Sequence, residues 1–529
     1  MSARFVLPAN QVEVFDTTLR DGMQVEGVSA SVVDKLRIAE QLDHLGVHYI
    51  EGGWPGANPK DEEFFARAKT ELQLTTSMLV AFGSTRRPAG KVDDDATLRN
   101  LINAETQAVC IVAKSWDYHV ETALQTTLVE GVAMVADSVK FLDGHGRMVM
   151  VDLEHFFDGF KHNKEFTLRV LEAAVVNGAT HLVLCDTNGG SLPHEIEATV
   201  AEVVRHVGSD AIIGIHCHDD TGCAVANSLA AVRAGARHVQ GTLNGLGERT
   251  GNTNLTTIIP NLQLKMGFDC LPEGRLERLT AVSNHVAEVL NRPLNPQAPY
   301  VGMSAFAHKA GLHVSAIVRA KDAYEHVSPD LVGNGTRFLV SEMAGRATIA
   351  MKAQELGLSA DGAVLSTILD ELKRLEFEGY HFEAADASLE LLMRRATGWE
   401  QEFFNVESMR VITDESTSGS FTTEATVKVW MGEEREVHTA EGNGPVNAID
   451  TALRACLAKK FPQLSRVHLT DYKVRILDSS SATGAVTRVL IDATDGDRTW
   501  TTIGVSPNII EASWRALEES IVYGLLHLA

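Results

Sequence analysis

The first half of the chain alternates short apolar segments with stretches in which apolar residues recur at helical spacing. Eight such apolar segments lie between Gln11 and about Gly267. Short apolar runs are typical of buried strands, and the spacing of Val33, Leu36, Ala39 and Leu42 is typical of an amphipathic helix. Eight strand–helix units of this size predict a TIM (β/α)8 barrel, with an open doubly wound sheet as the alternative.

The expected elements follow directly from this pattern. The predicted strands are Val12–Phe15, His48–Glu51, Leu79–Phe82, Ala108–Val112, Met148–Leu153, His181–Cys185, Ile212–His216 and His238–Leu243. The predicted helices include Ser31–Leu45, Leu128–Phe141 and Phe166–Val176. Glycine follows several helices, where its freedom to adopt positive φ ends a helix, at Gly46, Gly178, Gly208 and Gly235.

Polar residues follow these strands at the positions where a barrel places its chemistry, the mouth at the carboxyl ends of the strands. In chain order they are Arg20, Asp21, Glu51, Ser84, Lys114, Glu154, Thr187, His216, His218 and Asn252. A glycine-rich loop, residues 245–251, precedes Asn252 and leads from the eighth strand into a helix. This loop could approach a ligand closely or could simply be a flexible connection.

The triplet His216-Cys217-His218 indicates a metal site at the mouth. Residues i and i+2 of a strand point to the same face, so the two imidazoles converge. Asp21 can add a carboxylate oxygen and Asn252 an amide oxygen. Two nitrogens and two oxygens suit Mn²⁺, Zn²⁺, Co²⁺ or Mg²⁺. The alternative is that both histidines are hydrogen-bonded polar residues at a strand end.

Charge and composition exclude several classes of partner. The formal net charge of −23 argues against a nucleic-acid partner, which needs a basic surface. No apolar run approaches the ~20 residues of a membrane span, and no secretory signal is visible at the N-terminus. The six cysteines form no CxxC pair. A reducing, cytoplasmic location is expected.

Three motifs resemble those of the isopropylmalate, homocitrate and citramalate synthase family. They are Asp16-Thr17-Thr18-Leu19-Arg20-Asp21-Gly22, His216-Cys217-His218-Asp219-Asp220 and the GERTGN run that ends at Asn252. Two further segments, at residues 51–60 and 377–386, are similar to the citramalate branch. That branch condenses acetyl-CoA with pyruvate and water to give (R)-citramalate and CoA.

The resemblance implies a role for each matching residue. Asp21, His216, His218 and Asn252 would bind a divalent metal, and Arg20 would stabilise the developing enolate. Glu154 and Thr187 would lie against the keto acid. The segment His308-Lys309-Ala310-Gly311-Leu312-His313 matches a family motif and makes His313 an acid/base candidate, with Tyr324 nearby. Met23 departs from the family, in which many members carry glutamate there, and this weakens any transfer of substrate preference.

Each of these residues could instead have a purely structural role, and other activities are possible for the chain as a whole. Arg20 could be a structural ion-pair partner, Thr187 a helix cap, Glu154 an orienter of a histidine and His313 an exposed helix residue. Isopropylmalate or homocitrate synthesis is the nearest competing activity. A lyase resembling 3-hydroxy-3-methylglutaryl-CoA lyase is less favoured, because Gly241 to Asn252 contains no cysteine. A non-catalytic amino-acid sensor is disfavoured by the intact motifs.

The 529 residues predict three domains. We expect a barrel over 1–275, helical linker subdomains over 276–400 that carry His313, and a regulatory or dimerisation domain over 401–529. The last domain contains strand candidates Val406–Ile412, Ala425–Trp430 and Tyr472–Leu477, and two strand–strand–helix units whose prolines, Pro445 and Pro507, each begin a helix. The family implies a homodimer and an end-product effector, isoleucine; a purely structural module is the alternative.

Overall fold

The computed structural model describes residues 7–309, 311–340, 344–415, 417, 419–477 and 484–528. It divides into two compact units, each of which is described by itself. One unit extends to Phe306 and includes His326–Thr336. The other consists of Ala307–Glu325 and the chain from Arg337 onwards.

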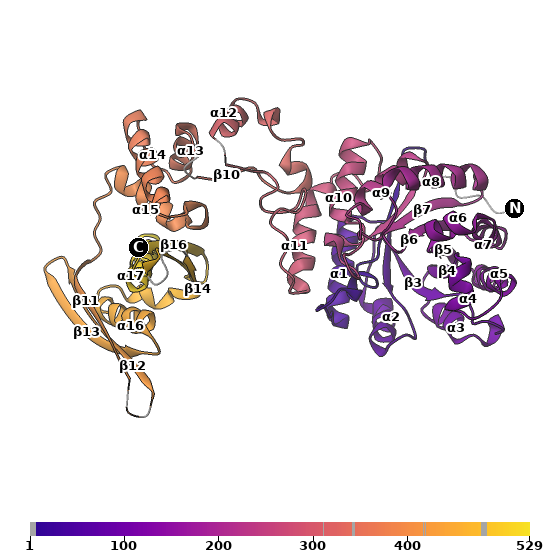
Figure 1. The fold of residues 1–529 in the computed structure, drawn as a ribbon, viewed down its shortest axis with the longest axis horizontal. Coiled ribbons are helices and arrows are strands. Elements are labelled where there is room, and N and C mark those ends of the chain that lie inside the picture. The colour runs from indigo at the N-terminus through magenta and orange to yellow at the C-terminus, as the bar shows by residue number, and fades with distance from the viewer. Residues whose placement is uncertain are drawn as a thin grey trace. The chain divides into compact units, whose positions relative to one another are not determined.

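The first unit is a closed barrel of eight parallel strands in sequence order, which confirms the barrel over the open sheet (Figure 1). Pairing of β1 with β8 closes it, with Glu13 opposite His238 and Asp16 opposite Gly241. The strands are β1 (Glu13–Asp16), β2 (Tyr49–Gly53), β3 (Met78–Ser84), β4 (Ala108–Lys114), β5 (Met148–Glu154), β6 (His181–Asp186), β7 (Ile212–Cys217) and β8 (His238–Gly241).

Helices surround the strands and bury their apolar sides against them (Figure 1). They are α1 (Val32–Leu45), α2 (Pro59–Glu71), α3 (Ala96–Asn103), α4 (Asp117–Thr122), α5 (Leu128–Gly144), α6 (Phe156–His162), α7 (Lys164–Val176), α8 (Pro193–Val207), α9 (Ala224–Arg233), α10 (Leu255–Pro260) and α11 (Leu279–Val289). The first of them shows why these boundaries form. Ser31 and Asp34 make a reciprocal capping box at its start, and Gly46 ends it at a φ of 93°.

The floor of the barrel, opposite the mouth, contains a buried polar cluster. Glu13, Tyr49, His181 and His238 are each the first residue of a strand. The Glu13 carboxylate lies 2.8 Å from His181 Nε2 and 3.4 Å from His238 Nδ1, and Tyr49 Oη donates to it at 3.0 Å. The shortest of these separations is that of a direct hydrogen bond, so the cluster is held by its own ionic hydrogen bonds.

Removal of the Glu13 carboxylate is expected to destabilise the barrel strongly. The variant Glu13→Ala leaves His181 and His238 buried without their shared partner, which costs about 3 kcal/mol or more. Calorimetry should show the barrel transition about 5 °C or more lower. Glu172→Ala is the matched control, since Glu172 lies 2.8 Å from His206 in a largely exposed pair, and it should shift the transition little.

The loss of stability caused by Glu13→Ala should depend on pH. Burial by itself would raise the pKa of Glu13, but hydrogen bonds from His181 and His238 outweigh it and hold that pKa well below its ordinary value. The ionised carboxylate therefore stabilises the fold above the ordinary glutamate pKa of about 4.3, and this stability is lost as the pH falls below it. A wild-type-to-variant difference that grew on acidification would contradict this account.

The second unit begins with β9 (Ala307–His308) and β10 (Arg337–Phe338), which pair in parallel. Its helices before the sheets are α12 (Gly311–Arg319), α13 (Arg346–Glu355), α14 (Gly362–Phe377) and α15 (Asp386–Ala396). Two antiparallel sheets follow, β11 (Asn405–Glu415), β12 (Phe421–Met431) and β13 (Glu434–Gly442), then β14 (His468–Ile476), β15 (Thr487–Thr494) and β16 (Thr499–Ser506). Helix α16 (Pro445–Leu457) follows the first sheet and α17 (Ile509–Leu528) the second.

The internal repeat is present, with one strand more in each unit than the sequence pattern showed. In the first sheet the added strand is β13, which lies at the edge and has no buried residue in its alternating pattern. The predicted strand Tyr472–Leu477 falls largely within β14, an edge strand that is almost wholly exposed. Pro445 occupies the first turn of α16 as predicted. Pro507 does not begin α17, because Asn508 intervenes and its side chain accepts a hydrogen bond from Ile510 N at 2.9 Å.

Within the part of the chain that the structure describes, none of the helices combines the length and the apolar character that crossing a membrane requires.

Candidate active site

The turn after β1 is fixed by hydrogen bonds within the sequence Asp16-Thr17-Thr18. The Asp16 carboxylate accepts from Thr18 N at 2.8 Å and from Thr18 Oγ1 at 2.9 Å. Thr18 Oγ1 in turn accepts from Leu243 N, in the loop after β8. Burial raises the pKa of Asp16 to about 7. This turn therefore presents Arg20 and Asp21 toward the loops that follow β7 and β8.

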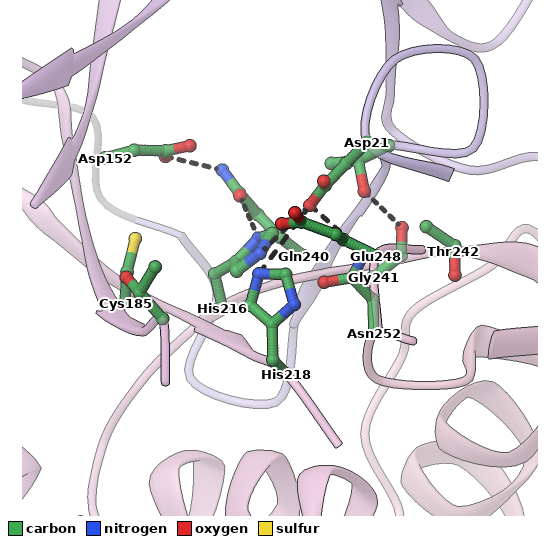
Figure 2. Close-up of polar contacts among 12 residues, drawn as sticks. Asp21, Asp152, Cys185, His216, His218, Gln240, Gly241, Thr242, Glu248 and Asn252 are labelled. Carbon is green, nitrogen blue, oxygen red and sulfur yellow. Dashed lines mark hydrogen bonds and ion pairs between the residues drawn. The ribbon is translucent and has the colours of Figure 1, made fainter. Parts of the chain in front are cut away.

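Asp21, His216 and His218 converge at the barrel mouth, as Figure 2 shows. Asp21 Oδ2 lies 3.3 Å from His216 Nε2 and 4.0 Å from His218 Nε2. All three residues are at least nine-tenths buried. These separations are typical of ligand atoms arranged around a shared ion.

Asn252 completes this set from the loop after β8. Its Nδ2 donates to Asp21 Oδ2 at 3.1 Å, while its buried Oδ1 has no hydrogen-bond partner among the described residues. A buried amide oxygen without a partner is costly unless something binds it. Two imidazoles, one carboxylate and this oxygen form a donor set that fits a divalent cation.

The charge state of the cluster suits metal binding. Burial alone would raise the pKa of Asp21, but the Arg20 charge and a hydrogen bond from His216 hold it far below its ordinary value. Burial and the neighbouring His216 lower the pKa of His218 to about 4, so its imidazole is neutral at pH 7. An ionised carboxylate and a neutral imidazole are the forms that bind metal ions. Burial alone would lower the pKa of His216, but its hydrogen bond to Asp21 raises it, so a bound ion would displace a proton from that ring.

Arg20 lies beside this cluster and is held on three sides. Its Nε donates to Glu51 Oε2 at 2.7 Å, and its Nη1 lies 3.6 Å from Asp21 Oδ1. The guanidinium stacks 3.9 Å from the centroid of the Phe82 ring. A cavity of about 690 Å³, lined among others by Gln24 and Trp54, adjoins it. The predicted ion pair with a carboxylate therefore coexists with a guanidinium that borders a cavity of ligand size.

Gly247 and Gly251 let the loop after β8 fold tightly around Asn252. Gly247 has a φ of 152°, and a Cβ there would lie 2.4 Å from Asn252 Nδ2. Gly251 has a φ of 97°, and a Cβ there would lie 2.0 Å from Gly245 O. Both backbones approach their neighbours too closely for any side chain. The loop is thus built to seat the Asn252 amide against Asp21.

The variant Gly247→Ala is expected to weaken divalent-metal binding by about tenfold or more, because the new methyl group displaces the Asn252 amide. Calorimetric titration with Mn²⁺ measures this. Gly208→Ala is the control, since Gly208 also has a positive φ, of 63°, but open space around its Cβ. Equal losses in both variants would assign the effect to backbone strain and not to Asn252.

Comparison with known proteins decides the family. A model described as HMGL-like matches residues 11–286, one for the homocitrate synthase post-HMGL domain matches 300–379, and the LeuA allosteric (dimerisation) domain matches 383–525. An (R)-citramalate synthase from Streptomyces coelicolor is 54% identical over 97% of this chain and 96% of its own. One from Aquifex aeolicus is 53% identical over 98% of both.

The chain belongs to the (R)-citramalate synthase family. It is an acyltransferase of the type that converts the acyl group into an alkyl group on transfer. A probable 2-isopropylmalate synthase from Methanopyrus kandleri is less similar, at 33% identity over 97% of this chain and 98% of its own. Among solved structures, a Bacillus subtilis HMG-CoA lyase aligns over 54% of this chain and 97% of its own, with 21% identity and a TM-score of 0.47.

The two residues predicted to lie against the keto acid, Glu154 and Thr187, are found at the ends of β5 and β6. Glu154 forms an ion pair with Lys114, the residue opposite it in the β4–β5 register. Thr187 Oγ1 accepts a hydrogen bond from His155 N at 2.9 Å. Both candidates are only partly buried. The structure therefore places Glu154 at the end of β5 and Thr187 directly after the adjacent strand β6, each held by a neighbour.

His313 and Tyr324 lie in the second unit. Their rings stack with centroids 4.2 Å apart at 25°, which agrees with the predicted proximity. His313 lies on α12, as expected of a helix residue, and Tyr324 is 45% exposed. In the preceding motif, His308 Nε2 lies 3.5 Å from Glu325 Oε1. Ala310 of the motif is outside the described residues.

Glu51 was predicted to lie at the mouth, but the buried polar residues that accompany it, Cys110, Asp152 and Gln240, were not. Glu51, Cys110 and Asp152 bring their polar atoms within 4.8 Å of one another inside the barrel. Gln240 of β8 donates to Asp152 Oδ1 at 2.9 Å and lies 2.9 Å from His216 Nδ1 (Figure 2). Burial raises the pKa of Glu51 to about 7. The signal was available, since each of these residues interrupts an apolar strand.

Proposed function

We propose that this chain condenses acetyl-CoA with pyruvate and water to give (R)-citramalate and CoA. The observation that carries the proposal is the meeting of Arg20 with Asp21, His216, His218 and Asn252 at one end of the barrel. Similarity to (R)-citramalate synthases over almost the whole chain supports the choice of substrates.

Asp21, His216, His218 and Asn252 would hold a divalent ion, which when bound supplies a Lewis acid that polarises and orients the keto acid. The remaining steps belong to side chains. The methyl group of a thioester is a very weak acid, so its deprotonation needs both a base and stabilisation of the enolate oxygen. Arg20 supplies that stabilisation, because Glu51 anchors its Nε while the rest of the guanidinium borders the cavity.

Thr187 and Glu154 would bind and orient the keto acid. Thr187 Oγ1 accepts from His155 N, which leaves its hydroxyl hydrogen to donate to the carboxylate of pyruvate. Lys114 holds Glu154 in place by their ion pair. A fixed keto acid presents one face of its carbonyl to the enolate, which is the condition for forming a single enantiomer.

His313 would act as the acid/base, with Tyr324 stacked against it. The variant His313→Ala is expected to lower kcat by about a hundredfold to ten-thousandfold, the range typical of general acid–base catalysis, and to change the KM for pyruvate much less. Steady-state kinetics measure both. Leu312→Ala, which changes the exposed neighbour on the same helix, is the control. An unchanged kcat would remove His313 from catalysis.

A free-thiol release assay with acetyl-CoA tests the substrate assignment. Pyruvate should give a kcat/KM at least about a hundredfold above 2-oxoisovalerate and 2-oxoglutarate, since a pocket shaped for a methyl group excludes larger side chains. Chiral chromatography should identify the product as (R)-citramalate. A preference for 2-oxoisovalerate would instead make the chain a 2-isopropylmalate synthase.

The C-terminal sheets and helices would form a regulatory domain within a homodimer, and isoleucine would be the effector of this first step in a pyruvate route to that amino acid. The match of residues 383–525 to the LeuA allosteric (dimerisation) domain supports this. Isothermal titration of isoleucine should give saturable heat, and the same concentrations should inhibit thiol release. No heat and no inhibition would refute isoleucine as the effector.

A further inference from the structure

We propose that Gln240 and Asp152 are positioning residues that fix the tautomer and the ring orientation of His216, so that its Nε2 is always available to the ion. The inference rests on the proposed metal site of the mouth. Neither residue belongs to the ligand set. Gln240 lies opposite His216 in the β7–β8 register, and its side chain lies between His216 and Asp152 (Figure 2).

The direction of each hydrogen bond follows from the chemistry of Asp152. Its carboxylate, when ionised, only accepts hydrogen bonds, so the side-chain amide of Gln240 must present its NH₂ group to Asp152 Oδ1, at 2.9 Å. The Gln240 oxygen therefore faces His216 Nδ1, also at 2.9 Å. An oxygen can only accept, so His216 carries a hydrogen on Nδ1. The proton that a bound ion would displace is therefore the one on Nε2, the atom that lies 3.3 Å from Asp21 Oδ2.

Burial makes this arrangement strict. Gln240 is 0% exposed, Asp152 4% and His216 5%. Water cannot replace either hydrogen bond at these positions, and an unpaired amide there would cost the full desolvation of its polar groups. His218 has no such support, because its buried Nδ1 has no hydrogen-bond partner in the described part of the chain. This chain of hydrogen bonds from Asp152 through Gln240 to His216, the relay, thus supports only one of the two histidines.

Asp152, at the far end of the relay, also lies close to Glu51, the carboxylate that holds Arg20. Polar atoms of Asp152, Cys110 and Glu51 lie within 4.8 Å of one another, and Glu51 accepts from Arg20 Nε. One buried group of strand residues therefore orients a metal ligand on one side and the guanidinium on the other. Asp152 links the two because it receives the Gln240 amide.

Titration of the metal-depleted full-length chain with Mn²⁺, followed by calorimetry, tests the proposal without reference to turnover. Gln240→Leu should weaken Mn²⁺ binding by about tenfold to a hundredfold, the cost typical of losing a partner that orients a ligand. Asp152→Val should weaken it through the same relay, so the double variant should bind no worse than Gln240→Leu alone. Asp152→Asn, which keeps an acceptor oxygen, should stay within about threefold of wild type.

His238→Leu is the matched control. His238 lies two residues before Gln240 on β8 and therefore points to the same face, but at the floor. It should lower the melting temperature and leave Mn²⁺ affinity unchanged. If Gln240→Leu does not fold, the ring ¹⁵N spectrum of His216 in the wild type, assigned by its loss in His216→Gln, should show the Nδ1–H tautomer.

The relay would be overturned by unchanged affinity in Gln240→Leu, by additive losses in the double variant, or by an Nε2–H tautomer at His216. Asp152→Asn as weak as Asp152→Val would also overturn it, since charge and not hydrogen bonding would then be the cause. Wild-type protein that binds no Mn²⁺ in an Asp21-dependent manner would remove the metal site itself. Wild-type binding and thiol release with an unaffected Gln240→Leu would leave the proposed function standing and remove only the relay.

Discussion

Replacement of Asp21 by alanine is expected to lower kcat/KM by about a thousandfold or more in a chain that still folds. Asp21 is the only carboxylate in the predicted ligand set, and its loss also frees the amide of Asn252. A Lewis acid at such a site is worth several kcal/mol of transition-state stabilisation, and each 1.4 kcal/mol is about tenfold in rate. Thiol release and the metal content by mass spectrometry should fall together.

The fold should tolerate this change, because Arg20 keeps its hydrogen bond to Glu51. Asp43→Ala is a matched control: Asp43 is also a buried carboxylate, but it accepts hydrogen bonds from Thr75, Thr76 and Ser77, away from the cluster. It should lower the melting temperature and retain its metal. Full activity of Asp21→Ala in metal-free buffer would end the metal hypothesis.

Arg20→Lys is expected to lower kcat by roughly a hundredfold to a thousandfold, with a much smaller change in the KM for either substrate. Loss of one preorganised donor to a developing oxyanion typically costs about 3–4 kcal/mol. Lysine keeps the charge, but it lacks the planar fork that holds Glu51 at Nε while it presents the remaining N–H groups. Steady-state kinetics by thiol release separate kcat from KM.

Arg86→Lys provides the comparison. Arg86 is a buried arginine paired with two carboxylates, those of Glu130 and Asp137 on α5. It should lose stability to a similar extent and retain most of its kcat. A kcat for Arg20→Lys within fivefold of wild type would show that Arg20 serves only to pair Glu51 and Asp21.

The strands of the barrel could be predicted because each is a short apolar run, and each is followed by a stretch in which apolar residues recur at helical spacing. Their ends could not. The ladders of β3, β4 and β5 continue into polar residues, Ser84, Lys114 and Glu154, because neighbouring backbones go on pairing at the mouth whatever side chains they carry. The convergence of His216 and His218 could be predicted, since two positions along a strand return a side chain to the same face.

Partners that face each other across the barrel could not be predicted. Gln240 and Asp152 are 88 residues apart, and no local pattern states that β8 and β5 direct them to the same point. The floor cluster is hidden for the same reason, since Glu13 and His181 are 168 residues apart. In each case a polar residue in an apolar strand was visible, but only closure of the sheet assigns its partner.

Closure of β1 onto β8 also sets when the ion can be acquired during synthesis. The amide of Asn252 and the carboxylate of Asp21 meet across 231 residues, and the turn after β1 is tied to the loop after β8 through Thr18 and Leu243. A nascent chain that has not yet formed its eighth strand therefore lacks the ligand Asn252. It also lacks the hydrogen bond from Leu243 to Thr18, which holds the turn that carries Asp21. Loading of the proposed metal site would therefore have to follow completion of the barrel, and fragments that stop before Asn252 should retain the ion less well than the whole chain.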